Sequence, residues 1–171
     1  PAFISIGSSL GAHRFFQYFD AFGLTEKTGI DLPAEAQNSY YTEDRLNAVS
    51  LASCSFGQSN TVTPIQMITA ASAAINGGKL LTPHVVSKIL DSDGNTVEEF
   101  GTQVRRQVIS EETSKTMSEV LEQVVSANGG TNAYVKGYRI GGKSGTAQKL
   151  NKEEDVYIFS YFAFAPVDDP Q

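Results

Sequence analysis

The sequence contains few of the residues that build metal sites or disulfide frameworks. Its 171 residues include one cysteine, Cys54, and two histidines, His13 and His84, which lie far apart in the chain. A single cysteine excludes an internal disulfide framework and a cysteine-rich zinc site. The two histidines offer no paired spacing for a metal ion. Nothing in the composition therefore indicates a bound metal.

Charged residues and long apolar runs are also scarce. Only 19% of the residues are charged, and 13 basic against 19 acidic residues give a formal net charge of −6. This acidic balance argues against nucleic acid or an anionic membrane surface as the main partner. The longest mostly apolar stretch, residues 157–167, is too short to span a bilayer. Because 40% of the residues are apolar, the chain can bury a core, and wholesale disorder is excluded.

The first third of the chain is predicted to be helical and then irregular. Residues 3–22 carry apolar side chains at mostly three- and four-residue spacing, which predicts two short helices hinged near Gly11. Gly23 is well placed to end the second of them. Residues 24–60 are polar and interrupted by glycine and proline, so we expect a loop with a short helix from Glu43.

Two further helices are expected. Thr63-Pro64-Ile65-Gln66 can form a capping box with proline at the first helical position, and this helix should run to Ile75. Ser110 can cap a second helix, which Asn128-Gly129-Gly130 should end. The apolar residues expected to face the core are Ile65, Ile68, Ala71 and Ile75 in the first helix and Met117, Val120, Leu121, Val124 and Val125 in the second.

Strands are expected around and after these helices. Residues 84–100 have the pattern of a hairpin with a turn at 91–95, and 138–140 and 157–165 each have the composition of a strand. Helices followed by an antiparallel strand pair favour an α+β fold. The chain opens on an apolar helix and stops six residues after its last strand, at Gln171, so we expect it to be a fragment.

The glycine-rich segment at 137–144 matches the phosphate-binding pattern G-x-x-x-x-G-K-[ST]. That motif needs a buried strand before it and an amphipathic helix opening at the lysine. Residues 131–136 are only weakly apolar, the residues after Lys143 make a poor helix face, and only 27 residues follow Ser144. The context therefore disfavours a nucleotide-binding protein. For such a protein, ATP with magnesium would raise the melting temperature.

A second interpretation places Lys143, Ser144, Gly145 and Thr146 in an edge strand that pairs with residues 157–165. This order suits the binding of an extended peptide, because glycine lets a ligand backbone approach and free edge groups can pair with it. The hydroxyl can bind a carboxylate, and the ammonium group supplies the positive field that favours it. An ordinary exposed turn is the simpler interpretation of these four residues taken alone.

Longer motifs add a family resemblance. Residues 137–148, GYRIGGKSGTAQ, resemble the segment around the K-[ST]-G triad in the transpeptidase domain of class B penicillin-binding proteins, which also carry an S-x-x-K and a serine–asparagine triad. Residues 22–35, 56–66, 76–83 and 160–166 are similar to other segments of that family, in family order. The resemblance implies a penicillin-binding and serine β-lactamase type of fold, an antiparallel sheet packed with helices. Residues 1–171 would form part of that domain, with 84–100 as a hairpin insertion.

The resemblance also implies a function. It is that of a peptidoglycan D,D-transpeptidase, which cross-links stem peptides ending in D-Ala-D-Ala through an acyl-serine intermediate and which β-lactams inhibit. Lys143 would order the proton network and attract the donor carboxylate, Ser144 would hydrogen-bond that carboxylate, and Gly145 would leave room for the donor backbone. The backbone N–H of Thr146 would be one oxyanion donor. No metal or cofactor is implied.

Some of the family's motifs are not found in the sequence. No serine is followed by lysine three positions later, and the one Ser-x-Asn, at 126–128, has the character of a helix end. The nucleophile and the middle triad would belong to an upstream half of the domain, and a last strand and helix would follow residue 171, so the chain alone is predicted to be inactive. Lys27-Thr28-Gly29 repeats the lysine triad in a loop that is structural in the family. Ser59 stands where many relatives have glycine.

Two family-level alternatives stay open. The parent protein can be an active enzyme, or a relative that has lost catalysis and serves as a β-lactam sensor or scaffold. The upstream triads would distinguish them, whereas division, elongation and sporulation roles are not separated by these residues. Class B relatives are held at the outer face of the cytoplasmic membrane by an N-terminal helix, which is not among these residues.

Overall fold

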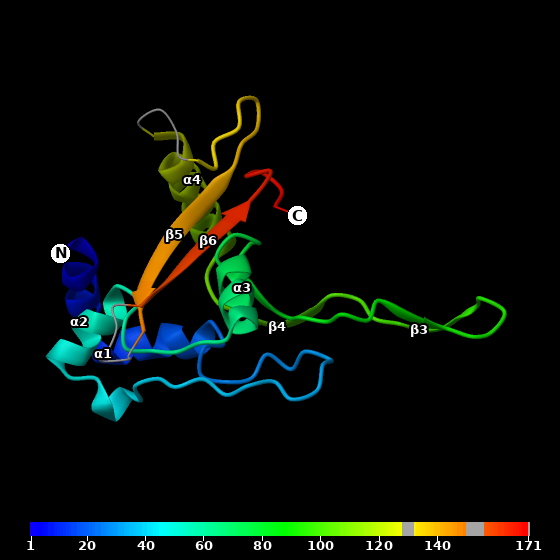
Figure 1. Ribbon diagram of the computed structural model, residues 1–171, viewed down its shortest axis with the longest axis horizontal. Coiled ribbons are helices and arrows are strands. Elements are labelled where there is room, and N and C mark those ends of the chain that lie inside the picture. Colours follow the sequence, from blue (N-terminus) through cyan, green and yellow to red (C-terminus); the bar gives the residue numbers. More distant parts are fainter. Residues whose placement is uncertain (128–131, 150–155, 171) are drawn as a thin grey trace.

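The computed structural model describes residues 1–127, 132–149 and 156–170. The elements in chain order are α1 (Ala2–Ala21), the 3₁₀ helix η1 (Glu43–Arg45), α2 (Ala48–Ser55), α3 (Pro64–Ala73), β1 (Lys79–Thr82), β2 (Lys88–Leu90), β3 (Thr96–Glu99), β4 (Gln103–Gln107), α4 (Glu111–Ser126), β5 (Gly141–Gln148) and β6 (Tyr157–Phe164). The strands form three antiparallel pairs, β1 with β4, β2 with β3 and β5 with β6 (Figure 1). Helices combined with antiparallel strands confirm the predicted α+β class.

Helix α1 bends where the sequence predicts a hinge. Gly11 has φ 80° and ψ 160°, a conformation outside the helical region that separates two helical segments. At the other end, Gly23 has φ 77°, and the Leu24 N–H donates to the Phe19 carbonyl at 3.2 Å. A left-handed glycine that turns a following N–H back onto the last carbonyls is a common helix ending, so the predicted stop is confirmed.

Helix α2 was not predicted, whereas the short helix from Glu43 is present as η1. Asn47 caps α2, because its side-chain oxygen accepts the N–H groups of Val49 and Ser50 at 2.9 and 3.0 Å. The helix is only eight residues long and serine-rich, so its apolar periodicity is weak. Nearby, Ser59 has φ 70°, a left-handed conformation that favours glycine.

Helix α3 begins as predicted but buries a different face. The Gln66 N–H donates to Thr63 Oγ1 at 3.2 Å and the Thr63 N–H donates to Gln66 Oε1 at 2.9 Å, which completes the capping box. Gln66 also donates from Nε2 to the Glu26 carbonyl at 2.7 Å and is buried. This contact places Gln66, Ala70 and Ala73 inward, so the prediction that Ile68 is buried is wrong. Ile75, just beyond the helix, is buried as expected.

Helix α4 is capped by Ser110 as predicted, since Ser110 Oγ accepts the Thr113 N–H at 3.1 Å. Of its predicted apolar face, Val125 is buried and Leu121 is partly buried, whereas Met117, Val120 and Val124 are exposed. Ser114 is buried instead, because its hydroxyl donates to the Ala74 carbonyl and accepts the Gly77 N–H, both at 3.0 Å. The predicted stop at 128–130 lies outside the described residues.

The β2–β3 hairpin confirms the hairpin predicted within 84–100, and in Figure 1 it projects far from the helices. Asp91 closes its turn by accepting the N–H groups of Asp93 and Asn95 at 3.0 and 2.8 Å. The prediction of a strand at 138–140 is wrong, because strand β5 begins only at Gly141.

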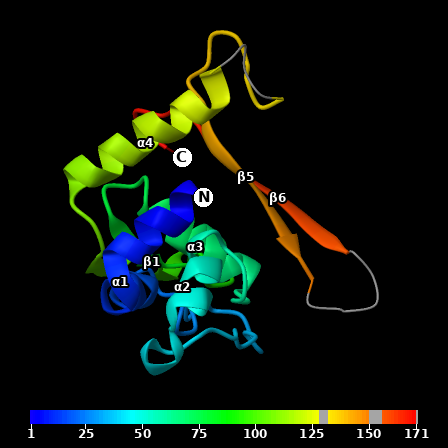
Figure 2. The same ribbon diagram turned by 90° about the vertical axis from the view of Figure 1, so that its left-hand side faces the viewer.

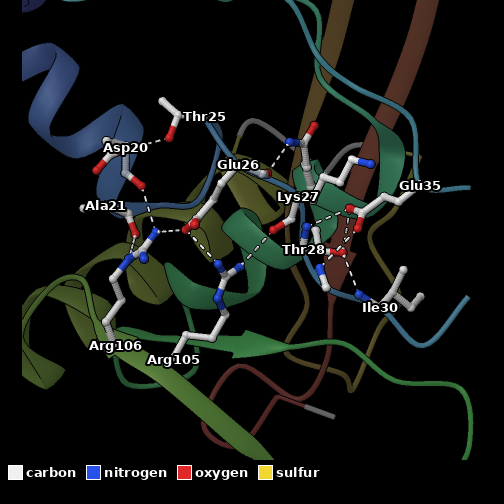
Figure 3. A network of polar contacts seen from close by, with 12 residues as sticks. Asp20, Ala21, Thr25, Glu26, Lys27, Thr28, Ile30, Glu35, Arg105 and Arg106 are labelled. Atoms are coloured by element: carbon white, nitrogen blue, oxygen red, sulfur yellow. Dashed lines mark hydrogen bonds and ion pairs between the residues drawn. The ribbon is translucent and has the colours of Figure 1, made fainter.

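Strands β1 and β4 were missed, and a bulge in their pairing shapes an ionic network. Leu80 pairs with Arg106 and Leu81 with Val104, so Arg105 is an extra residue in β4. A bulge re-aims side chains, and here both Arg105 and Arg106 reach Glu26 Oε1, at 2.8 and 2.6 Å (Figure 3). Arg106 also donates to the Ala21 and Asp20 carbonyls at 2.8 and 2.9 Å, which ties β4 to the end of α1.

The Lys27-Thr28-Gly29 segment folds as a structural loop around one carboxylate. Glu35 Oε1 accepts the Thr28 N–H and hydroxyl at 2.7 and 2.8 Å, and Oε2 accepts the Gly29 N–H at 3.1 Å (Figure 3). Burial raises the pKa of Glu35, but these hydrogen bonds outweigh burial, so the net pKa lies below its ordinary value of 4.5. Asp31 then accepts the Val85 and Val86 N–H groups at 2.8 and 2.9 Å and links the loop to the projecting hairpin.

Replacing Glu35 with glutamine is expected to destabilise the protein by about 1–2 kcal/mol. Both carboxylate oxygens accept hydrogen bonds, so the NH2 group of the glutamine would replace one acceptor and leave a backbone N–H donor unpaired. The carboxylate has a lowered pKa, so its contribution is present above the ordinary pKa of 4.5 and is lost as pH falls through the folded value. Urea unfolding should therefore separate the two proteins at neutral pH and bring them together well below pH 4.5. Glu119→Gln, at an exposed position of α4, is the matched control. A constant difference at all pH values would contradict this account.

Candidate active-site strand

Strand β5 carries the four residues that the sequence analysis selected. It pairs with β6 along its whole length, with Lys143 opposite Phe162, Gly145 opposite Ser160 and Thr146 opposite Phe159. The predicted strand pairing is therefore confirmed. The phosphate-binding interpretation is wrong, because residues 141–148 form a continuous strand and no helix opens at Lys143.

The hydrogen-bond pattern decides which backbone groups of β5 face away from β6. The Lys149 N–H donates to the Val156 carbonyl at 2.8 Å, and this pair continues the β5–β6 register. Hydrogen-bonded and non-hydrogen-bonded pairs alternate in an antiparallel ladder. Lys143 and Gly145 therefore bond to β6, whereas Ser144 and Thr146 direct their N–H and C=O groups to the opposite edge. Among the described residues, β6 is the only strand that pairs with β5.

The side chains of the strand divide between its two faces. Ser144 and Thr146 are two residues apart, so both hydroxyls lie on one face, and both residues are exposed. Lys143 lies on the other face, and its Nζ donates to the Ser144 carbonyl at 2.7 Å. A carbonyl that points to the open edge is free to accept this bond, which agrees with the alternation. The edge thus presents an ammonium group, two hydroxyls and two outward backbone N–H groups within four residues.

Gly145 lies close to a side chain of the neighbouring strand. A Cβ at this position would lie 2.7 Å from Ser160 Oγ on the neighbouring strand. From the sequence, this glycine is expected to serve ligand approach, and Ser160 is not singled out because no sequence pattern gives the pairing register. At the base of the strand, a Cβ on Gly141 would lie 2.2 Å from the Phe164 ring, and one on Gly142 would lie 2.7 Å from the Phe162 carbonyl oxygen.

The base of the β5–β6 hairpin sits on the core. Phe164, Val167 and Ile75 form a buried cluster against which Leu121 and Phe162 pack. Figure 2 shows α4 lying beside this end of the hairpin, while the far end extends away from the helices. The core therefore anchors the strand through its first residues and leaves Lys143 to Gln148 exposed or only partly covered.

Arg139, which precedes β5, is a residue that the sequence analysis did not select. Its Nε and Nη2 donate to the two carboxylate oxygens of Glu122 on α4, at 2.7 and 2.6 Å, and its Nη1 donates to Asp168 after β6. The hydrogen bond from Arg139 lowers the pKa of Glu122 below its ordinary value despite desolvation. The hydrogen bonds that Arg139 donates to Glu122 and, second in effect, to Asp168 raise the pKa of Arg139. The Arg139 carbonyl also accepts the Val167 N–H at 3.2 Å.

Within residues 1–127, 132–149 and 156–170, no group of three or more His, Cys, Asp or Glu side chains is arranged to hold a metal ion. None of the helices in these ranges combines the length and apolarity that a membrane span needs.

Comparison with known proteins gives the family. The model of the penicillin-binding protein transpeptidase domain matches residues 1–171. Stage V sporulation protein D of Bacillus subtilis is 44% identical over 174 residues, which cover 99% of this chain and 27% of that protein. Penicillin-binding protein PbpB of Mycolicibacterium smegmatis is 30% identical over 98% of this chain and 28% of its own length. The chain thus spans about a quarter of the length of these curated relatives.

Solved structures agree with this assignment and with the predicted fold. The crystal structure of penicillin-binding protein 3 from Mycobacterium tuberculosis, complexed with aztreonam, superposes with a TM-score of 0.87. It is 27% identical, and the match covers 99% of this chain and 40% of that one. The D,D-transpeptidase domain from Eggerthella lenta, at 23% identity and a TM-score of 0.85, shares the fold. Sequence and structure together place this chain in the penicillin-binding protein transpeptidase family.

Proposed function

We propose that the protein to which these residues belong is a serine-type peptidoglycan D,D-transpeptidase, and that β5 is the strand along which its donor peptide binds. A serine attacks the carbonyl carbon of the terminal D-Ala-D-Ala bond, and D-alanine leaves with a proton. An amine of a neighbouring stem peptide then attacks the acyl-serine ester and releases the serine. β-Lactams resemble the donor and acylate the same serine.

The observation that carries this proposal is the outward backbone of Ser144 and Thr146 beside Lys143. The Thr146 N–H on the open edge is placed to donate to an oxyanion, an interaction typically worth about 3–4 kcal/mol of transition-state stabilisation. The Ser144 hydroxyl is accessible to a substrate carboxylate, and the Lys143 ammonium supplies positive charge next to it. An extended donor would pair with the edge as an added strand.

The remaining parts of the site would come from outside these 171 residues. No serine of the sequence is followed by lysine three positions later, so we propose that an upstream half of the domain supplies the nucleophile and the middle triad. The relatives solved with aztreonam and ampicillin support β-lactams as ligands. We place the parent protein in the cell envelope, at the outer face of the cytoplasmic membrane, held by an anchor outside these residues.

Labelling of the full-length protein with a fluorescent penicillin tests this function. We expect a covalent adduct that survives denaturation, is prevented by unlabelled penicillin, and maps to a serine outside residues 1–171. The 171 residues alone should take up no label. A full-length protein that binds penicillin only reversibly would instead be a non-catalytic sensor or scaffold. An adduct on the isolated 171 residues would contradict the assignment of the nucleophile.

A further inference from the structure

We propose that Arg139 is a positioning residue for β5, and that its hydrogen bonds to Glu122 and Asp168 determine where Lys143 to Thr146 lie in the active site. The inference rests on the proposed function and extends it, because it assigns a role to a residue that does not touch the substrate. Three segments meet at this one side chain: helix α4, the entry to β5 and the exit from β6.

Arg139, Glu122 and Asp168 form a side-chain cluster, here called the clamp, that holds three segments of the chain together. The planar guanidinium group engages Glu122 through two parallel hydrogen bonds at 2.7 and 2.6 Å, which fixes its orientation as well as its distance. A third nitrogen reaches Asp168, and the Arg139 carbonyl accepts the Val167 N–H at 3.2 Å. Both the main chain and the side chain of Arg139 therefore hold the exit from β6, and the side chain also holds α4.

The position of Arg139 determines the position of Lys143, because the chain between them is short and closely packed. Lys143 follows Arg139 by four positions, which is about 13 Å of extended chain. Gly141 and Gly142 lie on this path, and both are packed so closely against Phe164 and Phe162 that no Cβ fits. Close packing resists local adjustment. A shift at Arg139 therefore moves Lys143 and Ser144 instead of being absorbed between them.

This ion pair differs from an ordinary surface pair on the same helix. Glu122 is bonded through both oxygens, and its side chain is only 23% exposed. Glu111, at the start of α4, meets Lys79 at 4.0 Å with a side chain that is 78% exposed. Exposed single-contact pairs contribute little to stability or geometry. Glu122 and Glu111 thus form a matched pair of the same residue type on one helix, and only Glu122 belongs to the clamp.

The test uses the full-length protein and its acylation by a fluorescent penicillin, with limiting acylation rate and penicillin affinity measured separately below the melting temperature. We expect Arg139→Gln and Glu122→Gln to lower the limiting acylation rate on the order of tenfold or more, because small displacements of catalytic groups have such effects. Arg139→Lys, which keeps the charge but not the paired hydrogen bonds, should recover only part of the rate. Glu111→Gln should acylate as the unmodified protein does.

The outcomes separate this inference from the function on which it rests. If the unmodified protein is not acylated, the proposed function and the inference both fall. If it is acylated and the folded Arg139→Gln and Glu122→Gln variants react at the same limiting rate, the clamp is only structural and the inference alone is overturned. If Arg139→Gln does not fold, Asp168→Asn decides, since Asp168 is exposed and its loss should lower the rate without unfolding. An unchanged Asp168→Asn rate would then overturn the inference.

Discussion

Replacing Lys143 with methionine in the full-length protein is expected to lower its acylation rate by penicillin about a thousandfold, within the range measured for loss of a proton-transfer group. Methionine keeps the length of the side chain and removes its charge. The Lys143 side chain is exposed on β5, so its loss should change the melting temperature little. The expected signature is a large kinetic effect in a protein that remains folded, measured by stopped-flow fluorescence and thermal unfolding.

Lys149 provides the matched control for this experiment. It follows β5 directly, is exposed, and by the alternation of the strand lies on the same face as Lys143. Lys149→Met removes the same charge six residues further along and should leave the acylation rate unchanged. Equal rates for Lys143→Met and the unmodified protein would show that β5 is not the active-site strand. Equal losses for both variants would indicate a general effect of surface charge.

The second large effect concerns folding. Gly78→Ala is expected to destabilise the protein by about 3–5 kcal/mol, the range of the most damaging single substitutions. Gly78 has φ 85°, and a Cβ there would lie 2.0 Å from the Ile109 carbonyl oxygen, which is backbone and cannot rotate away. The Gly78 carbonyl accepts the Val108 N–H at 2.7 Å. The substitution would therefore force apart the turn before β1 and the connection between β4 and α4.

Gly94→Ala measures separately how much of the destabilisation comes from the left-handed backbone conformation. Gly94 has the same φ of 85°, but a Cβ there would meet nothing within 4 Å. Its substitution should cost only about 1–2 kcal/mol, the penalty of the left-handed conformation itself. Urea unfolding of both variants measures the difference, which reports the clash at Ile109. Similar losses at the two positions would show that the backbone around Gly78 relaxes easily.

Features predicted correctly from the sequence have local causes. The hinge at Gly11, the capping box from Thr63 to Gln66 and the turn at Asp91 each depend on residues within a few positions of one another. Local side-chain and backbone preferences decide such features, so a single sequence is sufficient. The candidate active-site strand was identified differently, because the motif from Lys143 to Thr146 is recognised only through its family.

Features that were missed depend on contacts between distant segments. Strands β1 and β4 are four and five residues long, and their pairing and its bulge place Arg105 beside Arg106 at Glu26. The buried face of α4 follows from the hydrogen bonds of Ser114 to the end of α3 and not from apolar spacing. Arg139 meets Glu122 and Asp168 across 17 and 29 residues of sequence. No local sequence pattern indicates these long-range contacts, because they form only when the tertiary structure packs.

The most direct test of the central claim is a crystal structure of the full-length protein acylated by penicillin. The account predicts that the acyl carbonyl oxygen lies within hydrogen-bonding distance of the Thr146 N–H and that the penicillin carboxylate accepts from the Ser144 hydroxyl. The ligand should run along the open edge of β5, opposite β6. An adduct that lies away from this edge, with neither contact made, would contradict the assignment of β5 as the donor-binding strand.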